Sequence, residues 1–148
     1  MPQYDHCVMD PKTFPVWQAP DHSRKVSPLI GPDSCGANNM ATGLWWLAPG
    51  HQSEPDIHPD APEVYFVVAG EGILELEEER YPVKQGMTVY IPAGVKHQTF
   101  NTGTQELCYF FFFQSHSLRP GTRAETAMDT ASRREQIMNA GYQSILMS

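Results

Sequence analysis

Short runs of β-prone residues recur about every ten residues from Met40 onward, and turn residues separate them. The expected strands are Ala41–Leu47, Val64–Val68, Gly72–Glu77, Thr88–Ile91, His97–Phe100 and Leu107–Gln114. Glycine and proline occupy the gaps, where a chain that reverses direction needs a restricted or a left-handed backbone. Short strands at regular spacing are typical of an antiparallel sandwich or barrel. The pattern therefore predicts an all-β domain.

The two ends of the chain differ from this middle part. Residues 1–37 contain six prolines, which disfavour regular helix, so we expect an extended N-terminal arm. The β-rich region, 38–116, is the expected barrel. Residues 117–148 form a C-terminal tail, in which residues 129–140 have the pattern of a short helix that ends before Gly141.

The sequences of two expected strands indicate what lies against each of their faces. Tyr109–Phe113 is apolar on both faces, so one face should meet the core and the other should be covered by a second subunit or by the C-terminal tail. Trp45 and Trp46 are neighbours in another strand, and successive side chains of a strand point to opposite faces. One of the two should therefore face inward, either as core packing or as a pocket wall.

Charge and composition exclude several classes of function. The net charge is −7 and no basic cluster occurs, which argues against nucleic acid or an anionic membrane as a partner. No apolar run is long enough to span a bilayer, and the first residues lack the pattern of a signal peptide. The three cysteines are far apart and odd in number, so we expect reduced thiols and a cytoplasmic protein.

Two short segments carry side chains that bind metals. Residues two apart on a strand share a face, so Asp56 and His58 should point the same way, as should Glu63 and Tyr65. If His97 comes from a neighbouring strand, two imidazoles and one or two carboxylates converge inside the barrel. Such a set suits Fe(II), Mn(II), Ni(II) or Zn(II), and it leaves coordination positions open for a substrate.

The order of these residues resembles the two motifs of the cupin superfamily. The first family motif is a glycine, five residues, His-x-His, three or four residues, a glutamate, six residues and a glycine. Its positions here are Gly50, Asp56, His58, Glu63 and Gly70. The second is a glycine, five residues, Pro-x-Gly, two residues, a histidine, three residues and an asparagine. Its positions here are Gly86, Pro92, Gly94, His97 and Asn101.

The resemblance implies a jelly-roll barrel, that is, a double-stranded β-helix, which is usually a homodimer with one metal near an end of the barrel. One position departs from the family pattern, because Asp56 stands where the first histidine usually is. Asp56 can then be a direct ligand with His58, Glu63 and His97, or it can support a three-ligand set. His51 is a further candidate, although its spacing does not fit the motif. A degenerate site without metal is the remaining alternative.

The expected function is that of a metal-dependent enzyme acting on a small polar organic molecule. We favour a dioxygenase with Fe(II), because two histidines and one carboxylate resemble the site of non-haem iron oxygenases. A lyase, isomerase or cyclase is the alternative, similar to dimethylsulfoniopropionate lyases or polyketide cyclases, with Glu63 and Tyr65 as the catalytic residues that handle protons. In those lyases a tyrosine placed like Tyr65 is a base, whereas elsewhere it is packing. A non-catalytic ligand-binding cupin is the third alternative.

Overall fold

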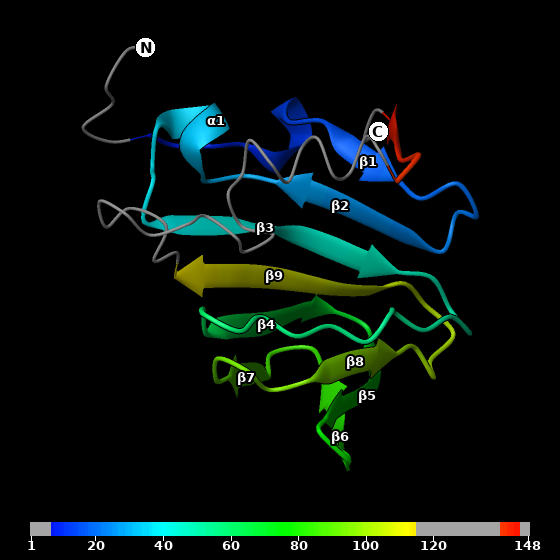
Figure 1. The fold of residues 1–148 in the computed structure, drawn as a ribbon. Coiled ribbons are helices and arrows are strands. Elements are labelled where there is room, and N and C mark those ends of the chain that lie inside the picture. Colours follow the sequence, from blue (N-terminus) through cyan, green and yellow to red (C-terminus); the bar gives the residue numbers. More distant parts are fainter. Residues whose placement is uncertain (1–6, 115–139, 146–148) are drawn as a thin grey trace.

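A computed structural model of the chain describes residues 7–114 and 140–145, and nearly all regular structure in them is β-strand (Figure 1). Seven strands form the larger sheet in the order β10-β1-β2-β3-β9-β4-β7, and three form a smaller sheet in the order β6-β5-β8. The strands are β1 (Val16–Gln18), β2 (Arg24–Pro28), β3 (Met40–Leu47), β4 (Glu63–Ala69), β5 (Glu71–Leu76), β6 (Glu79–Lys84), β7 (Thr88–Ile91), β8 (His97–Phe100), β9 (Leu107–Gln114) and β10 (Gln143–Ile145). All pairings are antiparallel. The prediction of an all-β jelly-roll fold is confirmed.

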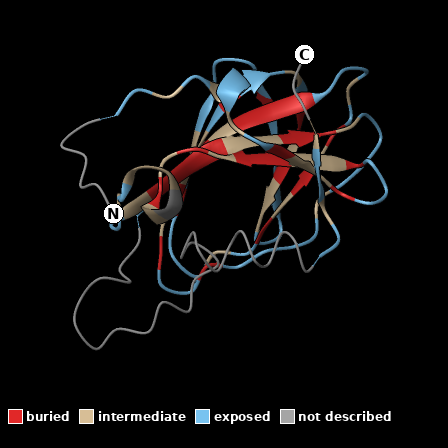
Figure 2. Cartoon of the chain, turned by 90° about the horizontal axis from the view of Figure 1, so that it is seen from above, coloured by how far each residue is buried: buried red, intermediate tan, exposed pale blue. Residues whose placement is uncertain are grey.

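Side chains from both sheets form the core. One buried cluster joins strands of the larger sheet to Leu74 and Val83 of the smaller one, and its buried members are Leu47, Val67, Leu74, Val83, Leu107 and Tyr109. Figure 2 shows the buried residues running along the strands, with exposed residues mostly in the connections. A strand that alternates core-facing and outward side chains can occupy only one register without exposing its apolar face. The alternation in β4 and β9 therefore also fixes which way the site residues point.

All six expected strands occur, with ends that agree to within one residue. The segment expected as an extended arm contains more regular structure than predicted. It holds β1 and β2, which extend the larger sheet beside β3, together with a 3-10 turn at Pro11–Thr13 and a short helix α1 at Pro32–Cys35. The expected helix at 129–140 lies outside the described residues, except Ala140, which is in a turn before Gly141.

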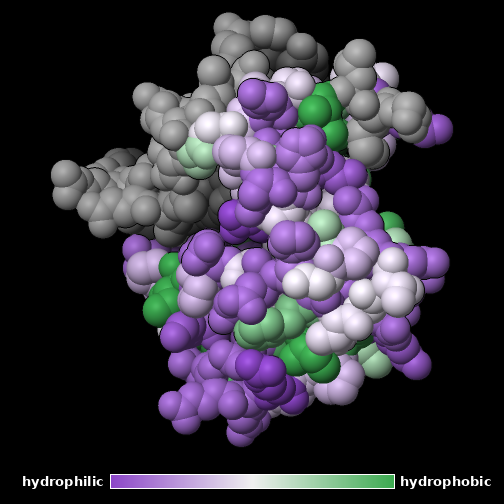
Figure 3. Space-filling view, turned by 90° about the vertical axis from the view of Figure 1, so that its right-hand side faces the viewer, coloured by the Kyte–Doolittle hydropathy of each residue, from purple (hydrophilic) through white to green (hydrophobic). Residues whose placement is uncertain are grey.

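The two faces of β9 have different surroundings, as the sequence pattern suggested. Tyr109, Phe111 and Phe113 are buried on the inner face, whereas Phe110 and Phe112 are half-buried on the outer one. The adjacent outer face of β4 and β7 leaves Phe66 and Tyr90 exposed. By contrast, the side of the molecule in Figure 3 is mostly hydrophilic, with small apolar areas.

Two further expectations concerned the state of the cysteines and the presence of a membrane-spanning segment. Cys7 is exposed, Cys35 is half-buried and Cys108 is buried, and all three are free thiols. Burial raises the pKa of the Cys108 thiol to about 12, so this residue packs as a small core side chain. Neither of the helices in residues 7–114 and 140–145 is long and apolar enough to cross a membrane.

Candidate metal centre

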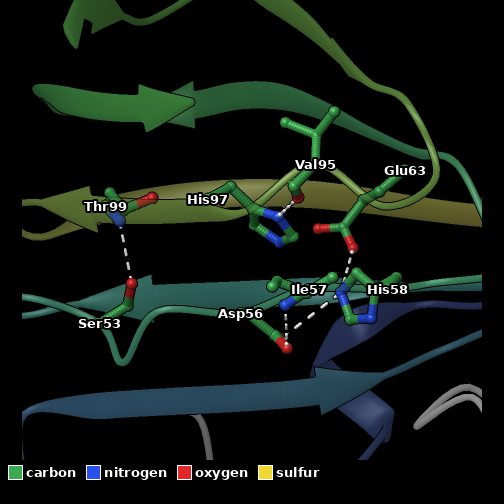
Figure 4. A network of polar contacts seen from close by, with 8 residues as sticks. All are labelled: Ser53, Asp56, Ile57, His58, Glu63, Val95, His97 and Thr99. Atoms are coloured by element: carbon green, nitrogen blue, oxygen red, sulfur yellow. Dashed lines mark hydrogen bonds and ion pairs between the residues drawn. The ribbon is translucent and has the colours of Figure 1, made fainter. Parts of the chain in front are cut away.

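Backbone pairing brings the two metal-binding segments together. The chain before His58 runs alongside β8, where Asp56 and His97 form an isolated β-bridge with both N–H···O distances at 2.9 Å. Ser53 reinforces this pairing, because its hydroxyl accepts a hydrogen bond from the Thr99 N–H at 2.9 Å (Figure 4). Asp56 and His97 thus lie opposite each other because their own backbones are hydrogen-bonded.

The turn before β8 fixes a second link between the segments. Gly94 has a φ of +83°, a region that side-chain-bearing residues rarely occupy, and its N–H donates to the His58 carbonyl at 2.8 Å. Pro92 precedes it and accepts the Val95 N–H at 3.2 Å. The turn therefore links the backbone of His58 to the segment that leads into His97.

Three side chains offer ligand atoms to one point. Donor atoms of Asp56, His58 and His97 all lie within 4.8 Å of one another. Both imidazoles are buried, whereas the Asp56 side chain is 56% exposed. The predicted convergence of these three residues is therefore present in the structure. Glu63, the fourth predicted ligand, is outside that group but adjacent to it, since its Oε2 lies 3.2 Å from Nε2 of His58.

Hydrogen bonds orient two of these ligands. Oδ1 of Asp56 accepts the Ile57 N–H at 2.9 Å, so Oδ2 faces Nε2 of His58 at 3.4 Å. Nδ1 of His97 lies 3.0 Å from the Val95 carbonyl oxygen, which can only accept. Nδ1 must then carry the proton, and Nε2 keeps the lone pair that a metal needs.

The surroundings of Glu63 are the observation that bears most directly on whether a cation fits this site. Its side chain is only 3% exposed, and Oε2 is buried with no hydrogen-bond partner. A buried carboxylate oxygen that accepts no hydrogen bond is costly unless a cation approaches it. With metal–ligand bonds of about 2.1 Å, two donors on one ion lie roughly 3 to 3.5 Å apart. The 3.2 and 3.4 Å separations from His58 fall in that range, so the residues fit a bound metal.

Tyr65 lies beside this carboxylate, as predicted from its place two residues after Glu63. Burial raises the pKa of the Tyr65 phenol well above its ordinary value, and the charge of Glu63 and a hydrogen bond to it raise the pKa further. The phenol therefore keeps its proton at neutral pH in the absence of a metal. This direction is opposite to the lowered pKa that a tyrosine base requires.

These residues share one cavity of about 510 Å³, a size typical of small-molecule sites. Its aromatic walls include Trp45, Tyr65, Phe111 and Phe113, whereas Trp46 points to the opposite face, packed with Val16 and Cys108. One tryptophan of the pair thus does line a pocket. His51 is exposed and does not belong to the lining, so it is not a ligand candidate here.

Two charged residues of the cavity lining, Arg24 of β2 and Glu54, were not identified from the sequence. The arginines of the C-terminal tail, Arg119, Arg123, Arg133 and Arg134, lie outside the described residues. The signal was weak, because Arg24 starts a strand of five residues that ends in proline. Nothing in the local pattern says that this strand adjoins β3.

Comparison with known proteins decides the family. The family model described as a cupin domain matches residues 43–113, which contain both motifs. Protein SchB of Streptomyces halstedii is 30% identical over 95 residues, which are 64% of this chain and 69% of that protein. The chain belongs to the cupin superfamily. The departure at Asp56 is therefore a variation within a true cupin motif.

Other relatives of this cupin differ in their described activities. The dimethylsulfoniopropionate lyase DddW of Ruegeria pomeroyi is 30% identical over 89 residues, 60% of this chain but only 57% of the lyase. A solved structure described as a sugar phosphate isomerase from a cupin superfamily, from Silicibacter pomeroyi, matches with a TM-score of 0.64 at 19% identity, over 74% of this chain and 76% of that one. At that identity the likeness shows the fold alone.

Proposed function

We propose that this cupin is a metal-dependent enzyme acting on a small organic molecule, with Asp56, His58, Glu63 and His97 as the metal ligands. The observation that carries the proposal is the buried Oε2 of Glu63, which has no hydrogen bond and lies 3.2 Å from Nε2 of His58, beside three mutually close donors. Two imidazoles with carboxylate donors suit Fe(II) best, with Mn(II), Ni(II) and Zn(II) as alternatives. The aromatic cavity around them offers space for the substrate.

The reaction that this ligand set favours is oxygenation of a dioxygenase type. When bound, Fe(II) would supply Lewis acidity and a site for dioxygen. The chain itself would position and shield the substrate. Trp45, Phe111 and Phe113 exclude water from one side, and the protonated Tyr65 hydroxyl can donate a hydrogen bond to a substrate oxygen.

A lyase is the second candidate, and two observations favour it. A named dimethylsulfoniopropionate lyase is among the relatives at 30% identity. Glu63 and Tyr65 also lie together in the lining of the cavity, a carboxylate beside a phenol that keeps its proton. In that elimination Glu63 would take a proton from a substrate carbon, the electron pair of the broken C–H bond would form a carbon–carbon double bond, and the leaving group would depart with the electrons of its own bond, while Tyr65 stays protonated.

The metal is tested first. We expect protein purified without chelator to hold close to one divalent metal ion per chain by elemental analysis, and His97→Ala to lose it. His51→Ala is the matched control, because His51 is an exposed histidine of the same segment outside the cavity, and it should keep the wild-type metal content. Wild-type protein that stays metal-free after incubation with iron, manganese, nickel and zinc salts would contradict the proposal and favour a non-catalytic binding protein.

The reaction class is tested with the metal-loaded protein. An oxygen electrode would follow a screen of catechols, hydroxy acids and β-diketones, each with an anaerobic control. Oxygen uptake that depends on a substrate and disappears in His97→Ala supports the dioxygenase. Turnover of dimethylsulfoniopropionate that continues without oxygen supports the lyase instead.

A further inference from the structure

Arg24 places a cation in the wall of the candidate metal cavity. It begins β2 and lies opposite Leu47 of β3, and Val26, two residues along, packs in the buried cluster with Phe111 and Phe113. Side chains two apart on a strand share a face, so Arg24 is on the inner face. Among the described residues that line the cavity it is the sole lysine or arginine.

The guanidinium of Arg24 forms no ion pair among the described residues, although its charge acts on the exposed carboxylate of Asp21, three residues earlier. Its Nε is buried without a hydrogen bond. Two other cations of the described residues, Lys25 and Arg80, are paired. Lys25, the next residue, lies on the outer face, 3.1 Å from the Glu106 carboxylate and 5.2 Å from the centre of the Trp46 ring. Arg80 lies 2.8 Å from Glu75.

Arg24 is half-buried, and its Nε is costly in this position because it has given up water without gaining an acceptor. Nε is closed off from solvent, so an incoming group would meet the Nη donors instead. Three carboxylates also line the cavity, those of Glu54, Asp56 and Glu63, and without counter-charges they would repel an anion. A cation in this position offsets that repulsion, so the cavity can bind one more negatively charged group.

We propose that Arg24 binds an anionic carboxylate of the substrate, which makes this cavity a site for small organic acids. The proposal rests on the proposed function, because it identifies the substrate class of the same cavity. A planar guanidinium matches a planar carboxylate through paired N–H···O contacts. The aromatic walls formed by Trp45, Phe111 and Phe113 then suit an apolar body between the carboxylate and the metal-binding end.

A competing explanation is that Arg24 only balances the cavity's own carboxylates. The two explanations differ in what the loss of Arg24 would change. If Arg24 is only a counter-charge, its removal would change the affinity for the metal. The affinities for a neutral and for an anionic ligand would then change by the same factor. As an anion-binding residue, it would alter only the affinity for the anion.

The test uses benzoate and its neutral counterpart benzamide as probes, by isothermal titration calorimetry of the full chain. The proteins are wild type, Arg24→Gln, Arg24→Lys and Lys25→Gln, each loaded with Zn(II) and each titrated again without metal. We expect Arg24→Gln to weaken benzoate binding about ten- to a hundredfold, the size of a charge-assisted hydrogen bond. Arg24→Lys, which keeps the charge without the planar fork, should lose less. Lys25→Gln should bind both probes like wild type.

The outcomes separate the two proposals. Unchanged metal content with selective loss of benzoate binding supports the anion site. Equal benzoate affinity in wild type and Arg24→Gln, or wild type that binds no benzoate with or without metal, overturns it. If wild type takes up no metal, the proposed function fails, while the metal-free titrations still decide the role of Arg24. Circular dichroism of each variant shows whether it is folded, and Arg24→Lys provides the comparison if Arg24→Gln is not.

Discussion

Asp56 is the residue that sets this cupin apart from the usual motif, and its surroundings suggest that it acts as a ligand. Its backbone is paired with His97, and one carboxylate oxygen is held by the Ile57 N–H, so the other faces His58. Its exposure also makes it the part of the ligand set most open to solvent.

We predict that Asp56→Ala weakens metal binding by at least about tenfold, a loss that even an outer-shell change commonly causes. Asp56→His, which restores the family's usual residue, should retain the metal, because an imidazole can reach the same point. Competition with a metal-binding dye would measure both affinities. Glu54→Ala, which removes a neighbouring cavity carboxylate outside the donor group, is the control. Wild-type affinity in Asp56→Ala would show that Asp56 neither binds the metal nor supports the residues that do.

Tyr109 gives a prediction about pH. Burial raises the pKa of its phenol to about 12, from an ordinary value near 10. The folded state therefore holds this proton more tightly than the unfolded state does, so its contribution is complete below pH 10 and is lost as pH rises to about 12. We expect the free energy of unfolding to fall by roughly 2 to 3 kcal/mol across that interval from this group.

Urea unfolding at a series of pH values would measure this loss. The background should be Cys108→Ala, because the buried thiol also has a pKa raised to about 12 and would titrate in the same range. In that background Tyr109→Phe should make the curve between pH 10 and 12 shallower, and Tyr65, whose pKa burial also raises, should account for a remaining slope. A curve as steep as that of the tyrosine protein would place the titrating group elsewhere.

Site residues could be predicted from the sequence where a motif of fixed spacing contains them. They could not be predicted where only the tertiary fold brings them to the site. Asp56, His58 and His97 follow from short-range spacing, since strand alternation and a Pro-x-Gly turn determine their direction. Arg24 depends on β2 lying beside β3, a contact between segments about twenty residues apart in sequence that no local rule specifies. The lack of a hydrogen bond to the buried Oε2 of Glu63 also becomes visible only in three dimensions.

The same distinction holds for whole elements. The predicted strands were those with apolar alternation between clear turn residues. The strands β1 and β10 have three residues each and were missed. The strand β6 was missed because it contains Pro82 and is almost fully exposed, and it lies at the edge of its sheet, where proline is tolerated. Short strands of this kind are stabilised by their neighbours rather than by their own sequence.

Substitution is expected to be unfavourable at two glycines for different reasons, which are backbone strain at Gly94 and side-chain crowding at Gly43. Gly94 has a positive φ, yet a methyl group added there would meet no atom within 4 Å. We predict that Gly94→Ala costs about 1 to 2 kcal/mol of folding stability, from the left-handed backbone alone. It should also weaken metal binding, because this turn holds His58 against His97.

Gly43 in β3 is the opposite case. An added Cβ would lie 2.5 Å from the Phe111 ring and 2.7 Å from the Ser27 carbonyl oxygen. The carbonyl belongs to the paired strand β2 and cannot move alone, so Gly43→Ala should cost about 3 kcal/mol, the upper part of the range for overpacking. Urea unfolding at pH 7 would compare the two variants. A smaller loss for Gly43→Ala than for Gly94→Ala would contradict this ranking.

At the scale of the whole molecule, the outer face of the larger sheet has the character of an interface. Phe66 and Tyr90 are 44% and 63% exposed, and Phe110 and Phe112 beside them are half-buried. Phe66 lies opposite Phe110 in the sheet, so these aromatic side chains form one continuous apolar area. Such an area is rarely left in contact with water.

We therefore predict that the protein is a homodimer through this face, as the cupin resemblance implied. Sedimentation velocity at micromolar concentration should give a single species with twice the chain mass. Phe66→Glu should shift it to the monomer, because a carboxylate within the interface would be desolvated without a partner. Tyr81→Gln is the matched control, since Tyr81 is equally exposed but belongs to β6 of the smaller sheet. Monomeric wild type, or a dimer unaffected by Phe66→Glu, would mean that a different part of the chain covers this face or that the contact lies elsewhere.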